Sequence, residues 1–211
     1  DVLTVNDCLH ALLLKSANES ANALAEHVAG SREAFAEMMN DKAKELGCTG
    51  SHFDNPSGLF SENHYTTARD MALIAVAAFH NEKFLDIEKN LRHTLNGLQR
   101  LPEGNTIYME HKMMLPDSRF YDKRVVAGKT GFTKNSGNTL LTLAKEGDRR
   151  LVTVVLGDKT PYHYIDTKAL LDLGFLETEQ QELEDSANYL ERIRLEAVKQ
   201  GYITAEDKLH F

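Results

Sequence analysis

The sequence contains few residues of the kinds that build disulfide frameworks or metal sites. Only two cysteines, Cys8 and Cys48, occur in 211 residues, and the sequence leaves open whether they pair. Cys8 falls on the apolar face of a predicted helix, which favours a buried small residue over a disulfide or a ligand. The nine histidines show no metal-ligand spacing, such as two histidines flanking a glutamate on one helix. We therefore expect no metal and no other cofactor.

Long apolar runs and clustered basic residues are also missing. No segment approaches the roughly 20 apolar residues that a membrane-spanning helix needs. The net charge is −8, and the lysines and arginines are scattered, which argues against a nucleic-acid surface. No signal-peptide pattern is present, and the sequence begins at Asp1, only a few residues before a predicted helix. We expect the natural N-terminus, with any export signal, to lie upstream.

The first half of the sequence predicts four helices. Apolar residues recur at helical spacing near residues 5–15, 21–30, 35–46 and 67–78. The first helix should begin with a T-x-x-D capping box at Thr4. Its apolar face should consist of Val5, Cys8, Leu9 and Leu12. The third helix is followed by a segment rich in Asn, Pro, Ser and Gly, residues 52–66, which predicts a long ordered loop.

The second half changes to strands. Short segments rich in Val, Leu and Thr, at residues 125–132, 139–144 and 151–156, predict strands, and the turn sequence KEGDRR makes the last two an antiparallel hairpin. A helix from about residue 164 to 173, ending at Gly174, should cover the sheet. Helices, then consecutive antiparallel strands, then a covering helix indicate an α+β fold. From Leu176 onward the sequence is acidic and helical in pattern, which predicts a solvated helical extension over 176–211 of unknown role.

Two places break the local pattern. Ser16 and Asn18 stand at the junction of the first two helices, and Lys129, Thr130 and Gly131 stand inside a predicted strand. Each has an ordinary explanation, because Ser and Asn often cap helices and a strand lysine often lies on an exposed face or edge. A lysine beside a reaction centre would also supply positive potential, and a glycine would let a peptide backbone approach the strand. This strand edge could therefore bind a peptide in an extended conformation.

The order of these residues gives the pattern a more specific meaning. S-A-N at 16–18 and K-T-G at 129–131 resemble two of the three motifs of the D-alanyl-D-alanine carboxypeptidases among the low-molecular-mass penicillin-binding proteins. With the intervening segments, the resemblance covers about residues 1–175. It implies a transpeptidase-like domain, the C-terminal part of a serine β-lactamase/DD-peptidase fold. The extension from Leu176 does not resemble the family's usual β-rich C-terminal domain.

The resemblance implies catalytic roles for three residues. Ser16 would relay protons during acylation of the enzyme, and Asn18 would orient the substrate. Lys129 would be the lysine of the K-T-G motif, and its charge would hold nearby proton-transfer groups in useful states.

Four further residues would bind the substrate by the same resemblance. Thr130 would donate its hydroxyl to the substrate carboxylate, and Gly131 is the glycine of the motif. Phe132 would supply a backbone N–H to the oxyanion hole, and Thr133 completes the family's K-T-G-x-T.

One motif of the family is missing. Its nucleophile is the serine of S-x-x-K, yet no lysine in this sequence has a serine three residues before it. The lysine nearest to Ser16 stands in the sequence Leu12-Leu13-Leu14-Lys15, which offers no hydroxyl. Because an acyl-enzyme needs an activated hydroxyl, we expect the chain alone to be inactive and to be a fragment. We also expect it to be poorly soluble or partly unfolded, since missing strands would leave a sheet edge unpaired.

Three functions follow as hypotheses. The leading one is a serine-type D-Ala-D-Ala carboxypeptidase that trims peptidoglycan stem peptides outside the cytoplasm, with β-lactam antibiotics as covalent inhibitors and membrane association only through segments not present here. The second is a degenerate, non-catalytic peptidoglycan-binding module. The third is a serine β-lactamase, which would need a glutamate three residues before Leu95-Asn96, where Arg92 stands. His111 and Lys112, ahead of the K-T-G strand, are predicted to form a solvated surface pair.

Overall fold

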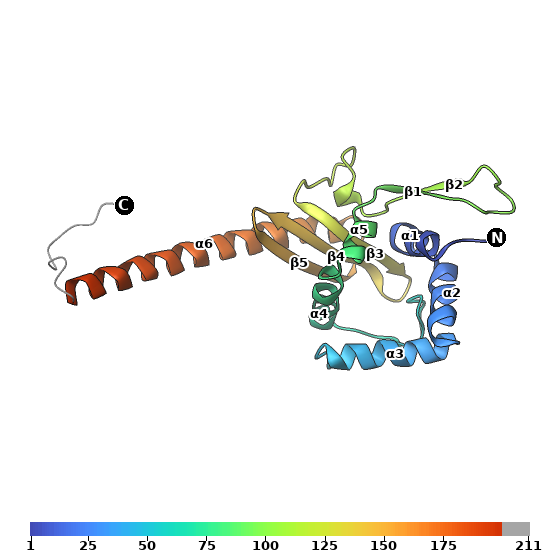
Figure 1. The fold of residues 1–211 in the computed structure, drawn as a ribbon, viewed down its shortest axis with the longest axis horizontal. Coiled ribbons are helices and arrows are strands. Elements are labelled where there is room, and N and C mark those ends of the chain that lie inside the picture. Colours follow the sequence, from blue (N-terminus) through green and yellow to red (C-terminus); the bar gives the residue numbers. More distant parts are fainter. Residues whose placement is uncertain (200–211) are drawn as a thin grey trace. The chain divides into compact units, whose positions relative to one another are not determined.

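The computed structural model describes residues 1–199, which fall into two compact units divided after Leu171. Figure 1 shows the order of the elements. The helices are α1 (Val5–Lys15), α2 (Asn18–Ala29), α3 (Arg32–Glu45), α4 (Ala68–Phe79), α5 (Glu82–Glu88), the 3₁₀ helix η1 (Lys112–Met114) and α6 (Tyr162–Lys199). The strands are β1 (Arg92–Leu95), β2 (Asn105–Tyr108), β3 (Val125–Thr133), β4 (Gly137–Glu146) and β5 (Arg149–Asp158). The α+β fold is therefore confirmed.

The helices of the first half begin where the capping residues predict. The Thr4 hydroxyl oxygen accepts the Asp7 N–H at 3.0 Å, and the Asp7 carboxylate accepts the Thr4 N–H at 3.1 Å, which confirms the capping box. The hydroxyls of Ser31 and Thr67 cap α3 and α4, each by accepting the N–H of the residue three positions later. Such caps satisfy backbone donors that the first turn of a helix leaves unpaired.

The predicted apolar face of α1 is wrong. The buried residues of the helix are Asp7, His10, Ala11 and Leu14, whereas Val5 is 53% exposed and Cys8 is only half-buried. The helix turns this mixed face toward β1, where an Asp7 carboxylate oxygen lies 2.7 Å from the His93 ring nitrogen Nε2. The rings of His10 and His93 stack with their centres 3.8 Å apart. Both cysteines are free thiols.

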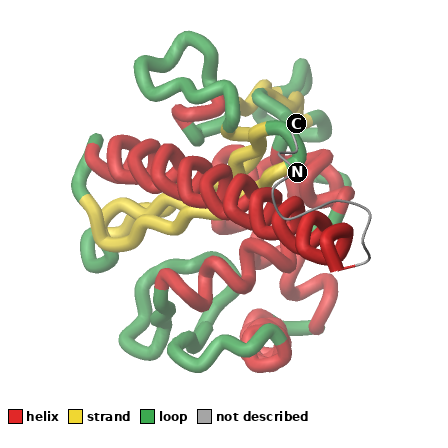
Figure 2. Tube along the Cα trace, turned by 90° about the vertical axis from the view of Figure 1, so that its left-hand side faces the viewer, coloured by secondary structure: helices red, strands yellow, loops and turns green. Residues whose placement is uncertain are grey.

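The three predicted strands form one antiparallel sheet in the order β3–β4–β5. On one face of the sheet, Ala127 and Leu143 pack with Ala75 and Phe79 of α4 in a buried cluster. Leu140, Thr142 and Ala144 are buried on the opposite face. Figures 1 and 2 show the first turns of α6 over this second face. Among the described strands, β3 pairs only with β4, so its other edge carries unpaired backbone groups.

The predicted end of the last helix at Gly174 is also wrong. The helix α6 continues through this glycine to Lys199. A glycine in a helix interior costs about 1 kcal/mol relative to alanine, and the strong helix formers around it outweigh that cost. Residues 200–211, including the predicted stop at Gly201 and restart at Thr204, lie outside the described residues. No helix of the described part has the length and apolar character needed to cross a bilayer.

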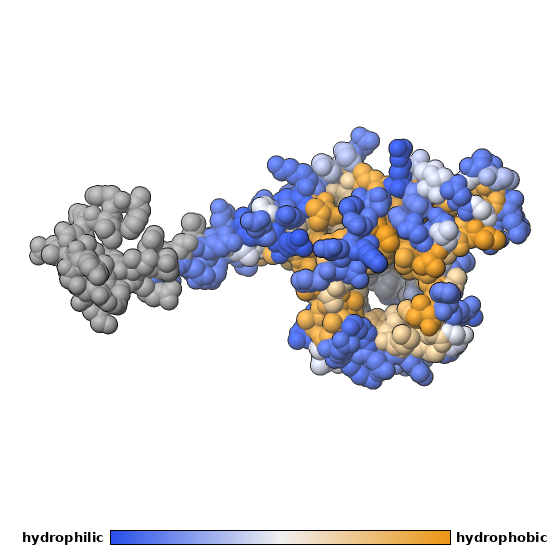
Figure 3. All heavy atoms as spheres, viewed as in Figure 1, coloured by the Kyte–Doolittle hydropathy of each residue, from blue (hydrophilic) through white to orange (hydrophobic). Residues whose placement is uncertain are grey.

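A hollow lies between α2, α3 and α4, and Figure 3 shows hydrophobic residues at its border. Apolar side chains on these helices are exposed, with Val28 at 59%, Met38 at 51% and Val76 at 44%. We therefore expect residues 1–211, expressed alone, to unfold with a denaturant m-value below the norm for this length, since the m-value follows the surface exposed on unfolding. Urea titration followed by circular dichroism measures it. A cooperative transition with an ordinary m-value would contradict this expectation.

Candidate active site

The structure brings Ser16 and Lys129 into contact although 113 residues separate them in the sequence. The Lys129 ammonium donates a hydrogen bond to the Ser16 hydroxyl oxygen, and a second one, 2.8 Å long, to the carbonyl oxygen of Thr130. The end of α1 and the edge strand β3 therefore meet at one point. A hydroxyl and a cation in direct contact form a pair through which a proton can pass.

The ordinary explanation of Ser16 and Asn18 as helix N-caps does not hold. The N-cap of α2 is Ala17, which makes no side-chain hydrogen bond there, while Ser16 is the C-cap of α1 and Asn18 is the first residue of α2. The side chain of Asn18 is half-buried beside this junction. Helix capping therefore does not account for the polar side chains of Ser16 and Asn18.

The backbone of Ser16 is held in a conformation that serine seldom adopts. Its φ of 54° makes it the one non-glycine residue with positive φ in the described part of the chain. The left-handed region costs a non-glycine residue about 1–2 kcal/mol. Backbone hydrogen bonds hold it there, from the Ser16 N–H to Leu12 at 3.0 Å and from the Ala17 N–H to Ala11 at 3.1 Å. This geometry aims the hydroxyl at Lys129, and strained residues of this kind concentrate at functional sites.

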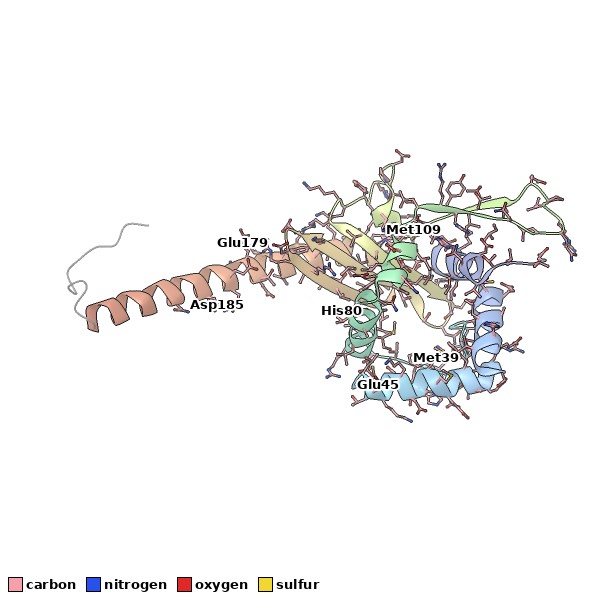
Figure 4. The ribbon with its side chains drawn as sticks, viewed as in Figure 1. Met39, Glu45, His80, Met109, Glu179 and Asp185 are labelled. Carbon is pink, nitrogen blue, oxygen red and sulfur yellow. The ribbon has the colours of Figure 1, made fainter. Side chains whose placement is uncertain are left out.

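The ammonium of Lys129 lies in a partly buried environment between carboxylates. Burial lowers the pKa of Lys129 below its ordinary value, while Glu88 and Glu110 oppose this by favouring the charged form. Glu110 also forms an exposed ion pair with Lys15, the last residue of α1, at 2.6 Å. That ion pair fastens the end of α1 to the chain before η1. Figure 4 labels the buried residue just before Glu110, Met109.

The free edge of β3 presents its backbone groups in alternation. The Gly128 N–H points away from β4, since its partner is a carboxylate oxygen of Glu88 at 3.2 Å. Because successive residues of a strand point to opposite sides, the N–H groups of Thr130 and Phe132 also face the free edge. The side chain of Phe132 is 67% exposed beside them. An extended peptide could therefore pair with this edge, as in other sheets that recognise peptides by strand addition.

The glycines of this strand are also required by packing within the sheet. A Cβ atom on Gly131 would collide with the hydroxyl of Thr139 on β4, and one on Gly128 would collide with the Leu141 carbonyl and the His111 ring. The hydroxyl of Thr133 is engaged in the turn after β3, where it accepts the Ser136 N–H at 3.0 Å. The structure thus gives Gly131 and Thr133 structural partners besides the binding roles predicted for them.

The prediction of a solvated pair at His111 and Lys112 is wrong for His111. Its side chain is 1% exposed, and its Nε2 lies 2.8 Å from the hydroxyl oxygen of Thr142 on β4. Burial lowers the pKa of His111 to about 4, so its ring is neutral near pH 7. Lys112 is exposed, as predicted.

Sequence reasoning missed Glu88, Glu110 and His111. The sequence held a signal for Glu88, since this acidic residue falls four positions after Phe84 and three after Leu85, on the apolar stripe of α5. Nothing in the sequence marked Glu110 as part of a site or His111 as buried, because both depend on contacts with residues far along the chain. Among the described residues, no three metal-binding side chains come together.

An antiparallel sheet bordered by a K-T-G lysine, in contact with a serine at the corner of a helical region, is the arrangement of the penicillin-interacting serine acyl-transferases. The comparison with known families then gives the particular group. The model of the D-alanyl-D-alanine carboxypeptidase family, peptidase family S11, matches residues 1–160. The chain belongs to this family.

Individual relatives agree with the family match. The chain is 35% identical over 178 residues to the D-alanyl-D-alanine carboxypeptidase DacC of Escherichia coli, covering 83% of this chain and 42% of that protein. The solved D-alanyl-D-alanine carboxypeptidase of Mycobacterium tuberculosis is 29% identical with a TM-score of 0.70, covering 82% of this chain and 64% of that one. Penicillin-binding protein D2 of Listeria monocytogenes, solved in its cefotaxime-bound form, is 25% identical with a TM-score of 0.69 and coverages of 82% and 66%. The chain thus spans less than half of the length of the E. coli relative.

Proposed function

We propose that the intact protein is a serine-type D-Ala-D-Ala carboxypeptidase. It would act outside the cytoplasm on peptidoglycan stem peptides that end in D-Ala-D-Ala, and β-lactams would acylate it. The observation that carries this proposal is the contact between the Lys129 ammonium and the Ser16 hydroxyl at the free edge of β3. In this proposal residues 1–175 are part of the catalytic domain, and 176–211 are an extension outside it.

The described residues would perform the steps that surround the covalent chemistry. The stem peptide would lie along the free edge of β3, with its terminal carboxylate held by the Thr130 hydroxyl and the charge of Lys129. Asn18 would orient the peptide, and the N–H of Phe132 would donate to the oxygen that becomes negative. Ser16 would carry a proton from the nucleophile toward the leaving D-alanine, with Lys129 beside it.

The nucleophile would come from residues outside this sequence. The family's S-x-x-K serine would attack the carbonyl carbon of the penultimate D-alanine, its proton would pass to the leaving amine, and the C–N bond would break. Water would then hydrolyse the resulting ester. Since no S-x-x-K occurs in the 211 residues, the chain alone should form no acyl-enzyme.

The proposal is tested on the full-length gene product with a fluorescent penicillin and with a peptide ending in D-Ala-D-Ala. We expect covalent labelling and release of D-alanine. A full-length protein that carries S-x-x-K but takes no label and releases no D-alanine would overturn the proposal. A start codon just upstream of Asp1 would favour the non-catalytic peptidoglycan-binding module, and rapid turnover of nitrocefin would favour a β-lactamase.

A further inference from the structure

Glu88 is a buried acidic residue that the proposed mechanism does not use. It is the last residue of α5, its side chain is 1% exposed, and its carboxylate accepts the backbone N–H of Gly128. A glutamate is almost never fully buried unless it is paired, because its charge loses hydration. The contact is directed at the residue that precedes Lys129, on the free edge of β3. A carboxylate in this buried position therefore needs an opposite charge nearby if it is to be ionised.

Lys129 is the cation that acts electrostatically on this carboxylate, and the other titratable groups nearby are Glu110 and His111. On β3, Lys129 favours the charged form of Glu88, and Glu88 in turn favours the ammonium of Lys129. Before η1, Glu110 is bound to Lys15 of α1 at an exposed position. His111 lies on the other side of Gly128, and its ring is neutral near pH 7. Glu88 is thus the buried carboxylate of this group, and it faces the strand edge directly.

We propose that Glu88 is a positioning residue for the acyl-transfer reaction, which keeps Lys129 charged against Ser16 and ends the peptide-docking edge of β3 at Gly128. The inference rests on the proposed function. With the N–H of Gly128 occupied by the carboxylate, the first backbone N–H of this edge that is open to a substrate is that of Thr130. The carboxylate offsets the burial of Lys129, so the ammonium persists to higher pH than it would alone.

A dependence on pH follows from the same geometry. Burial raises the pKa of Glu88 to about 7, so its charge changes within the neutral range. Above that pH the carboxylate is ionised and favours the ammonium of Lys129. Below it the carboxyl is neutral, but the lower pH itself favours the ammonium. We therefore expect the wild type and a variant without this carboxylate to be acylated alike near pH 6 and to diverge as the pH rises above 7.

The test uses the full-length protein and the second-order rate constant for acylation by a fluorescent penicillin, measured from pH 5.5 to 8.5. Glu88→Gln keeps an oxygen that accepts the Gly128 N–H but removes the charge. We expect acylation of this variant to be about tenfold slower than that of the wild type at pH 8 and little slower at pH 6. Glu82→Gln is the matched control, since it removes a charge at the exposed first turn of the same helix. Its profile should equal that of the wild type.

Other outcomes decide against the inference. A Glu88→Gln profile that matches the wild type, or a loss of equal size at every pH, would overturn it, because a merely structural role does not follow the titration of the carboxyl. If Glu88→Gln does not fold by circular dichroism, Glu88→Asp decides, since it keeps an ionisable carboxyl and should stay near the wild-type rate at pH 8. An aspartate variant that is about tenfold slower than the wild type at pH 8 would overturn the inference. A wild-type protein that takes no label at any pH would instead refute the proposed function.

Discussion

Replacing Lys129 by alanine in the full-length protein should lower the rate constant of acylation by a β-lactam by about 10²–10³-fold, the usual cost of losing one electrostatic group at a reacting centre. The ammonium donates to the Ser16 hydroxyl, and no other cation donates to that hydroxyl in the described part of the chain. Without it, the proposed proton relay would lose its orientation and the proposed substrate carboxylate would lose its counter-charge. Both effects act on the same chemical step.

The rate is measured with a fluorescent penicillin under pseudo-first-order conditions. Lys145→Ala is the control, because Lys145 is an exposed lysine at the far end of β4. It should react at the wild-type rate. If Lys129→Ala lost less than about fivefold, the ammonium would have no part in the reaction and the site would have to lie elsewhere.

The contact between the two side chains also predicts how their substitutions combine. Ser16→Ala alone should slow acylation strongly, since it removes the proton relay. The double variant with Lys129→Ala should be little slower than the slower single variant, because residues that act as a unit are not additive. Fully multiplicative losses would show that the two side chains act independently, contrary to the contact between them.

Features fixed by neighbouring residues could be predicted from the sequence. The N-caps Thr4 and Thr67 need only residues three positions apart, and both helices begin there. The three strands follow from runs of β-branched and apolar residues, and the turn between β4 and β5 from its polar sequence. The position of Lys129 and Ser16 at one site came from the order of two motifs rather than from any local pattern.

Features that depend on distant partners could not be predicted. The buried face of α1 includes Asp7 and His10 because both contact His93. His93 lies more than 80 residues later in the sequence, so no local pattern could reveal this contact. His111 is buried because Thr142 of β4 meets its ring. For Glu88, the sequence shows an acidic residue on an apolar stripe but not the strand edge that receives it. A polar residue in a helix pattern therefore says little about burial until its partner is known.

Glu88→Gln should stabilise the fold at neutral and higher pH while it slows acylation. Burial raises the pKa of Glu88 from 4.5 to about 7, so between these values the folded protein holds a proton that the unfolded chain has released. Stability from this group is fully present below pH 4.5 and is lost as pH rises through 7. At about 1.4 kcal/mol for each pKa unit, the ionised carboxylate costs the folded state about 3 kcal/mol at pH 8.

Glutamine cannot ionise, so the variant escapes this cost and keeps an acceptor for the Gly128 N–H. Its free energy of unfolding should exceed that of the wild type by up to about 3 kcal/mol at pH 8 and equal it near pH 4. Urea unfolding of the full-length protein, followed by circular dichroism at several pH values, measures the difference. Asp7 and Asp122 have depressed pKa values, which make the stability of both proteins fall in acid. Comparing the two proteins at each pH cancels this shared contribution.

A gain in stability together with a loss of acylation would show that the buried charge of Glu88 destabilises the fold but is needed for the reaction. Such a trade-off between stability and activity is common at functional sites. The stability difference should grow between pH 4.5 and 7, where the folded protein holds the extra proton, and the difference in acylation should grow above about pH 7, where the folded carboxyl ionises. If Glu88→Gln were less stable than the wild type at pH 8, the carboxylate would be a net stabilising partner of Lys129. The ion pair would then outweigh the burial of its charges, and Glu88 would serve the fold rather than the reaction.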